Sequence, residues 1–151
     1  MVQTLMATKF GAQPSLRADA EAIHKILWPH FVGLRREHLW RVDLDSRSGF
    51  LGAELVSIGT VDMTLAHPRE IFSGAIAAGA SRIVLAHNHP SGDVRPSAHD
   101  EEFFGRIASC GMILGIEVVD QLIIHDERCF SLKAGGRARG SPWARQKHAR
   151  R

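Results

Sequence analysis

Cysteine is scarce in this chain, and long apolar runs are missing from it. Only Cys110 and Cys129 occur among its 151 residues and they form no CxxC pair, so we expect reduced thiols in a cytoplasmic protein. No apolar run approaches the roughly 18–20 residues that a membrane-spanning helix needs. The N-terminal segment lacks the long apolar core of a signal peptide. The sequence also has no Walker A motif and no GxGxxG, so it gives no support for nucleotide binding.

What remains is the composition of an ordinary globular domain. Hydrophobic residues make up 44% and charged residues 23% of the chain, which argues against collagen, a coiled coil and a wholly disordered chain. A domain of this size buries roughly two-thirds of its unfolded surface, so it needs no disulfides to fold. The composition therefore predicts a single domain with an apolar core.

Positive charge is concentrated at the C-terminal end of the sequence. Residues 133–151 contain seven Lys and Arg and no acid, whereas the rest of the chain has twelve Lys and Arg against sixteen acids. We expect a basic, flexible tail outside the core. Such a tail either makes weak contacts with nucleic acid through phosphate groups or remains solvated without a partner.

The apolar spacing predicts a mixed sheet with helices packed against it. Ser15 can cap a helix over residues 15–28. Residues 38–44 alternate, which predicts a half-buried strand with Trp40 on one side and Arg41 on the other. The other expected elements are a strand at 50–58 in a hairpin with 38–44, a helix at 68–78, a strand at 82–87, a helix at 97–114, and strands at 116–124 and 128–132. This order is typical of an α/β domain.

The most informative stretch is HNHPSGDVRPSAHD, which begins at His87. His87 and His89 lie two residues apart at a strand end, so they project to the same face and can hold one metal ion. Pro90 forces the chain out of regular strand pairing and Gly92 lets it turn, so Asp100 in the next helix can return to the imidazoles. Two histidines and a carboxylate leave a fourth zinc position for water, which is typical of a catalytic site.

Ser97 has two interpretations. A hydroxyl beside the metal can donate a hydrogen bond to a developing oxyanion. Three residues before Asp100, Ser97 is also typical of a helix cap with a carboxylate at the third helical position. A lone H-x-H pair is weak evidence in itself, so these residues alone leave a metal site and a surface coincidence both open.

The complete set of four residues resembles a known motif. The spacing H-x-H, seven residues, Ser, two residues, Asp is similar to that of the JAMM (MPN-plus) metalloprotease superfamily, and His87, His89, Ser97 and Asp100 fit it without a gap. The resemblance implies zinc held by the two histidines and Asp100, one ion per chain, with Ser97 assisting the oxyanion.

Within that superfamily, the chain resembles the RadC branch in particular. The inner sequence HNHPSGD and the stretch HPREIF at 67–72 carry this likeness, which covers about residues 37–132. It implies a JAMM/MPN-like, cytidine-deaminase-like fold, with a mixed β-sheet flanked by helices in a single domain. Residues 1–36 are then an N-terminal extension, too short for the helix-hairpin-helix module of larger members. The chain therefore resembles the short, stand-alone form.

The resemblance also implies a catalytic glutamate at the start of the first sheet strand. Glu37 matches that position, and Glu54 in the second strand of the hairpin is the alternative. The implied activity is hydrolysis of an amide or isopeptide bond in a peptide substrate. The alternative is a DNA-repair accessory protein, associated with nucleic acid, whose zinc site is structural or vestigial. An exposed edge of the sheet leaves a homodimer open as well.

Two positions depart from the RadC pattern. RadC-like sequences usually carry Asp-His in the strand after the second helix, where this chain has Asp120 and Gln121. A glutamine cannot act as an imidazole, but a polar side chain there can support the metal site through a hydrogen bond. The threonine that is usual in the long helix after the motif is also missing from EEFFGRI.

Overall fold

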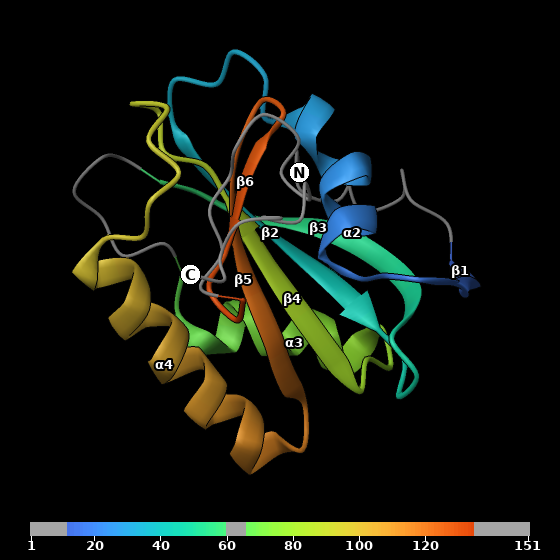
Figure 1. Ribbon diagram of the computed structural model, residues 1–151. Helices are drawn as coiled ribbons and strands as arrows, with labels where there is room; N and C mark the ends of the chain where they lie inside the picture. The colour runs from blue at the N-terminus through green and yellow to red at the C-terminus, as the bar shows by residue number, and fades with distance from the viewer. Residues whose placement is uncertain (1–11, 60–65, 135–151) are drawn as a thin grey trace, which may run out of the picture.

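In the part of the chain that the structure describes, six strands pair into one curled sheet, which three helices flank (Figure 1). The computed structural model describes residues 12–59 and 66–134. The strands are β1 (Gln13–Arg17), β2 (Glu37–Leu44), β3 (Gly49–Gly59), β4 (Arg82–His87), β5 (Glu117–His125) and β6 (Arg128–Ser131). The helices are α2 (Ala20–Leu27), α3 (Pro68–Ala77) and α4 (Ala98–Leu114), with a short 3₁₀ turn, η1, at Trp28–His30. The predicted mixed α/β domain is confirmed.

The strand order is β1-β3-β2-β4-β5-β6. β4 and β5 are parallel and α4 connects them, whereas every other neighbouring pair is antiparallel. A parallel pair needs such a crossover, because a tight turn can only reverse the chain. The crossover makes the end of β4 and the start of α4 the two flanks of one loop, residues 88–97.

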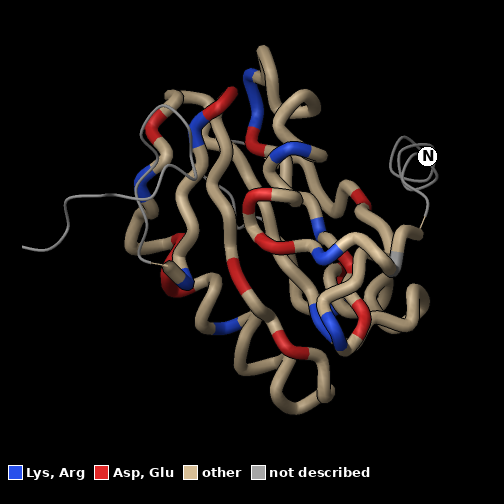
Figure 2. Tube along the Cα trace, turned by 45° about the vertical axis from the view of Figure 1, so that its right-hand side comes forward, with Lys and Arg blue, Asp and Glu red and all other residues tan. Residues whose placement is uncertain are grey.

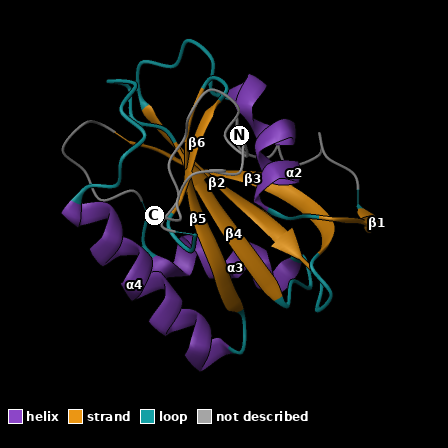
Figure 3. Ribbon diagram, viewed as in Figure 1, coloured by secondary structure: helices purple, strands orange, loops and turns teal. Residues whose placement is uncertain are grey.

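Helices lie on both faces of the sheet (Figure 3). Each face carries an apolar cluster. On one face Ile23 and Leu27 of α2 pack against Trp40 and Leu55 of the sheet. On the other face α3 and α4 contribute the residues Ile71, Phe72, Ala75, Phe103 and Ile107 to a cluster with Leu39 and Leu85. β4 is therefore buried from both sides, which explains why its sequence RIVLAH is almost continuously apolar.

The N-terminal helix differs from the prediction. The expected helix over 15–28 with Ser15 as its cap is wrong, because residues 13–17 form β1, which pairs antiparallel with β3. The helix starts only at Ala20, and Asp19 is its cap, accepting a hydrogen bond from the Ala22 N–H at 2.8 Å. Asp and Ser are about equally good N-cap residues, so pairing with the edge of the sheet decides where the helix begins.

β2 is also more deeply buried than the alternation predicts. Its sides alternate as expected, but α3 covers the polar side, so that Arg41 and Asp43 are only 2% and 3% exposed. Arg41 Nε and Nη2 donate to both oxygens of Asp43 at 2.7 and 3.0 Å. Arg41 Nη2 also donates to Glu54 at 2.7 Å, and Arg41 Nη1 donates to the Ile71 carbonyl. Because every charge is paired, this strand can be buried on both faces.

Charges of both signs are interspersed along the described chain (Figure 2). Of the basic tail predicted at 133–151, only Lys133 and Ala134 fall within the described residues. Within 12–59 and 66–134, no helix combines the length and the apolar character that crossing a membrane requires.

Arg41→Leu should strongly destabilise the fold, because it leaves the Asp43 carboxylate buried without its cation. We expect the free energy of unfolding, measured by urea denaturation, to fall by about 3–5 kcal/mol. Lys25→Met is the matched control, since Lys25 pairs with Glu21 on the surface with side chains 71% and 47% exposed. It should change the same free energy by less than about 1 kcal/mol. Equal effects of the two variants would contradict the role given to the buried network.

Candidate metal centre

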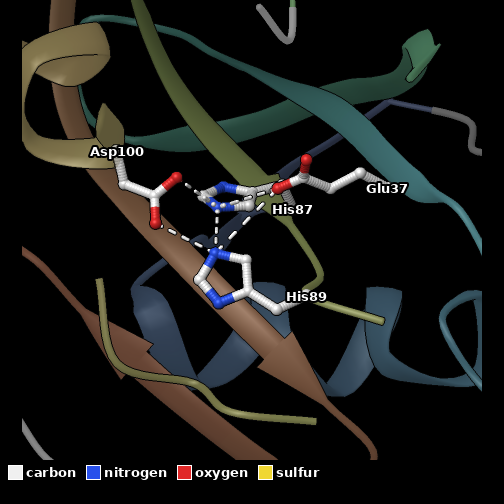
Figure 4. Close-up of side chains that lie close together, drawn as sticks. All are labelled: Glu37, His87, His89 and Asp100. Carbon is white, nitrogen blue, oxygen red and sulfur yellow. Dashed lines mark hydrogen bonds and ion pairs between the residues drawn. The ribbon is translucent and has the colours of Figure 1, made fainter. Parts of the chain in front are cut away.

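Two strand ends and one helix start bring four polar side chains together at one end of the sheet. β2 and β4 are antiparallel with Leu39 opposite His87, so Glu37, the first residue of β2, lies beside the chain that leaves β4. Asp100 reaches the same place from the first turn of α4. The side chains of Glu37, His87, His89 and Asp100 point toward one another (Figure 4). One ligand-type atom from each lies within 4.8 Å of the others.

The histidines and Asp100 form the tight part of this group. His87 Nε2 and His89 Nε2 are 3.2 Å apart. His87 Nε2 is 3.2 Å from Asp100 Oδ1, and His89 Nε2 is 2.9 Å from Asp100 Oδ2. Three donor groups thus converge from two segments of the chain, and the side chains of His87 and Asp100 are 0% and 4% exposed.

Asp100 is held in place by the start of its own helix. Ser97 is the N-cap of α4: its Oγ accepts from the Asp100 N–H at 3.1 Å, while its own N–H donates to Asp100 Oδ2 at 2.8 Å. The capping interpretation of Ser97 is therefore confirmed. Because Oγ is used as an acceptor, the hydroxyl proton of Ser97 remains able to donate into the adjoining cleft.

His89 is oriented by the loop that follows it. Its Nδ1 lies 2.7 Å from the Asp93 carbonyl oxygen. A carbonyl only accepts, so Nδ1 carries a proton and Nε2 is the nitrogen that can give its proton up to a metal ion. The Asp93 carboxylate in turn accepts from the Arg95 backbone N–H and guanidinium at 2.8–3.1 Å. The loop therefore fixes both the position of this imidazole and the nitrogen it presents.

The electrostatics of the group favour a cation. Burial favours the neutral form of Asp100, yet hydrogen bonds from His87 and His89 hold its pKa far below the usual range. Burial alone would lower the pKa of His89, but its hydrogen bond to Asp100 and the charge of that carboxylate keep the pKa above the ordinary value. The lowered pKa of Asp100 and the raised pKa of His89 both show that the group favours positive charge.

Of the two candidate glutamates, only Glu37 lies in the group. Glu37 Oε1 is 3.8 Å from His87 Nε2 and 3.9 Å from His89 Nε2, too far for a hydrogen bond. Its side chain is 14% exposed, and burial raises its pKa while the two imidazoles act in the opposite direction. Glu54 instead pairs with Arg41 at 2.7 Å.

Gln121 and Asp120 have different surroundings. The Gln121 side-chain amide lies 3.3 Å from His87 Nδ1, so it supports the site as the sequence analysis anticipated for this pair of positions. Asp120 points elsewhere, where its carboxylate accepts from the Ser131 hydroxyl and from the backbone N–H groups of Gln121 and Lys133.

Asn88 is a supporting residue that the sequence analysis missed. It lies between the two histidines and its side chain is turned the other way: Oδ1 accepts from the His38 N–H at 2.7 Å, and Nδ2 donates to the Arg36 carbonyl at 3.0 Å. These two bonds hold the backbone on either side of Glu37. The sequence could have indicated that Asn88 faces away from the two histidines, because alternate residues of an extended chain face opposite sides.

The group opens on a cleft of about 880 Å³. Glu37, His89, Ser97 and Asp100 line it, together with the loop residues Pro90, Ser91, Asp93, Arg95 and Pro96 and the helix residue His99. The ligand-type atoms are therefore reachable from solvent on one side only, since His87 is buried behind them.

The donor set fits a divalent transition metal ion. Two imidazole nitrogens and carboxylate oxygens are the ligands that such ions take in proteins. Asp100 is ionised, and His89 presents Nε2 because its Nδ1 is already bonded. His89 Nδ1 has the outer acceptor that metal-binding imidazoles have, and His87 Nδ1 has a polar neighbour, the Gln121 amide, on its far side.

A mixed α/β domain with this group at the end of its central strands has the architecture of the JAB/MPN class. Residues 17–137 match the family described as RadC-like JAB domain. The chain belongs to this family, as the sequence analysis anticipated.

Curated relatives agree with this assignment. The chain is 40% identical over 136 residues to a UPF0758 protein of Rubrobacter xylanophilus, covering 90% of this chain and 59% of the relative. It is 46% identical over 124 residues to one of Desulfitobacterium hafniense, covering 82% of this chain and 54% of the relative. It is 49% identical over 100 residues to one of Moorella thermoacetica, covering 66% and 44%. The chain thus spans about half the length of these relatives.

Gly92 is the turning point of the loop that carries His89. Its φ is +84°, its N–H donates to the His89 carbonyl, and its own carbonyl accepts from Arg128 at 2.9 Å. A Cβ at this position would meet the His125 ring at 3.2 Å. His125 at the end of β5 and Arg128 at the start of β6 therefore both lie against the histidine loop.

Gly92→Ala should weaken metal binding by shifting this loop. The positive φ costs a residue with a Cβ about 1–2 kcal/mol, and the contact with His125 adds to it. We expect zinc affinity, measured by competition with a chelating dye, to fall about tenfold. Gly79→Ala is the control: Gly79 has φ +70° with open space around its Cβ position, at the other end of β4. It should lose stability alone, and equal zinc affinities of the two variants would contradict the prediction.

Proposed function

We propose that this protein is a zinc-dependent hydrolase of the JAMM type that cleaves an amide or isopeptide bond. His87, His89 and Asp100 hold the zinc ion, Glu37 acts as general acid and base, and Ser97 assists the oxyanion. A bound zinc ion supplies a water of lowered pKa and polarises the substrate carbonyl.

The spacing of the three ligands supports zinc. Donors about 2.0–2.1 Å from a tetrahedral zinc ion lie about 3.3 Å from one another. The separations among His87 Nε2, His89 Nε2 and the Asp100 carboxylate are 2.9–3.2 Å, close to that value.

The position of Glu37 is the observation that carries the proposal of catalysis. Its carboxylate stands 3.8–3.9 Å from both Nε2 atoms without hydrogen-bonding to either, at the edge of the cleft. It can take a proton at Oε1 from a nucleophile that enters the cleft and return it to a leaving amine. Burial raises its pKa toward neutrality, which suits a group that must both accept and release a proton.

Ser97 and the cleft supply the remaining requirements. The Ser97 Oγ oxygen is occupied by the Asp100 N–H, so its proton is the part free to stabilise an oxyanion. The cleft of about 880 Å³ has room for a peptide segment. An amide in a peptide or isopeptide is therefore the substrate class that we propose.

Glu37→Gln should separate catalysis from metal binding. We expect it to bind zinc as the wild type does and to lose hydrolysis of a panel of fluorogenic peptides and isopeptides by about 100- to 10,000-fold. Glu54→Gln is the matched control and should leave both unchanged. His89→Ala should lose bound zinc in elemental analysis as well as hydrolysis. Hydrolysis that survives chelation, or that Glu37→Gln retains, would overturn the proposed mechanism.

A nucleic-acid-associated role is the second candidate, supported by the seven Lys and Arg of residues 133–151. Here the zinc site would be structural or vestigial. For both candidate functions we propose that the protein lies in the cytoplasm. The free cysteines Cys110 and Cys129 support this compartment. A homodimer through a sheet edge also remains a proposal.

Replacing the seven basic residues of the tail with Gln tests this candidate. If the tail binds nucleic acid, titration of the intact protein with DNA at rising salt should show affinity that falls steeply with salt and is lost in the variant. Equal binding by both proteins, or no binding at low salt, would remove the support for this role.

A further inference from the structure

Gln121 lies directly behind His87 in the core of the sheet. It belongs to β5, the parallel neighbour of β4, and is fully buried. Its amide Nε2 is 3.3 Å from His87 Nδ1, while its Oε1 is buried and has no hydrogen-bond partner among the described residues. An unpaired buried oxygen costs about 1–3 kcal/mol, so a fully buried amide in this orientation calls for a physical reason.

The proton on the His87 ring supplies that reason. With the amide nitrogen donating to Nδ1, the ring proton of a neutral His87 lies on Nε2, where it donates to Asp100 Oδ1 at 3.2 Å. A metal ion needs the Nε2 lone pair, so metal binding requires the ring proton to move to Nδ1. Nδ1–H then needs an acceptor, and the amide nitrogen of Gln121 cannot serve as one.

A half-turn of the amide exchanges its two ends. Oε1 then takes the place now held by the nitrogen, 3.3 Å from His87 Nδ1. The oxygen that lacks a partner in this orientation would accept the new Nδ1–H bond, and the amide nitrogen would take the place that has no partner among the described residues. A glutamine can therefore serve both tautomers of His87, which a fixed acceptor such as the Asp93 carbonyl behind His89 cannot do.

We infer that Gln121 is a positioning residue whose amide oxygen accepts a hydrogen bond from His87 Nδ1–H when a metal ion is bound, and so holds the ring with Nε2 toward the metal. The inference depends on the metal-binding part of the proposed function. It assigns Gln121 a role in metal affinity and none in contact with substrate, from which His87 separates it.

Two substitutions test the need for an acceptor at this position. Gln121→Met keeps the length of the side chain without a hydrogen-bonding group, and should weaken zinc binding about 10- to 100-fold in a competition titration. Gln121→Glu places carboxylate oxygens, which accept hydrogen bonds, at this position. Its zinc affinity should equal or exceed that of the wild type, or fall below it by no more than about threefold. Ser131→Ala is the matched control, because it removes a buried bond to Asp120 without touching His87, and should leave zinc affinity unchanged.

NMR of labelled imidazole nitrogens gives a readout that a packing effect would not change. In the zinc-loaded wild type and in Gln121→Glu, the His87 Nδ1 proton should be visible and slow to exchange with water. In Gln121→Met it should exchange faster at equal zinc saturation. The His87 signals are assigned from their absence in His87→Gln.

The outcomes separate this inference from the proposed function. A wild type that binds no zinc overturns both. If the wild type and Gln121→Met bind zinc with the same affinity and show the same exchange of the His87 Nδ1 proton, that result overturns only the role of Gln121. If Gln121→Met does not fold, Gln121→Glu decides, and zinc affinity more than about tenfold below the wild type overturns the inference.

Discussion

The antiparallel pairing of β2 with β4 is the constraint on which the site depends. Because Leu39 lies opposite His87, the beginning of one strand and the end of the other share one end of the sheet. Fifty residues of sequence separate Glu37 from His87, and the pairing of the two strands brings them together. Asn88 continues this pairing past the end of β4 with its side chain, where Pro90 prevents the strand from continuing. The site is thus positioned by the pairing of two central strands.

β2 contributes to two groups of acidic side chains that are neutralised in different ways. Asp43 and Glu54 are paired with Arg41, whose charge is permanent and whose planar fork satisfies both carboxylates. Glu37 and Asp100 face imidazoles, whose proton can be replaced by a metal ion. The first arrangement leaves no position for a ligand. The group of Glu37 and Asp100 keeps a position for a ligand, which is why it alone of the two has the properties of a binding site.

Local patterns predicted most of the fold, and the motif with its family resemblance predicted the residues of the candidate metal group. Period-two and helical spacing identified the central strands and the two long helices, and the motif around His87 identified the residues that the structure brings together. β1 was missed because five residues that pair with a sheet edge carry no pattern of their own. The burial of Arg41 was missed because sequence alternation shows which residues share a face but not which helix covers it. The choice between Glu37 and Glu54 likewise required register, since both stand on neighbouring strands.

The two histidines differ in how firmly their surroundings fix them. His89 stands on an exposed loop, but a backbone carbonyl fixes its tautomer, and the Asp93–Arg95 pair and Arg128 hold the loop around it. His87 stands in the rigid core, yet its outer neighbour is a side-chain amide that can rotate. His89 therefore has a fixed tautomer on a surface loop. His87 has a buried position on a central strand, but its outer neighbour does not fix its tautomer. A metal ion held by this group would take the Nε2 lone pair of both rings. His89 would then keep its Nδ1–H bond to the Asp93 carbonyl, whereas His87 would need a new acceptor for a proton on Nδ1, in the dry interior where a single hydrogen bond has its largest effect.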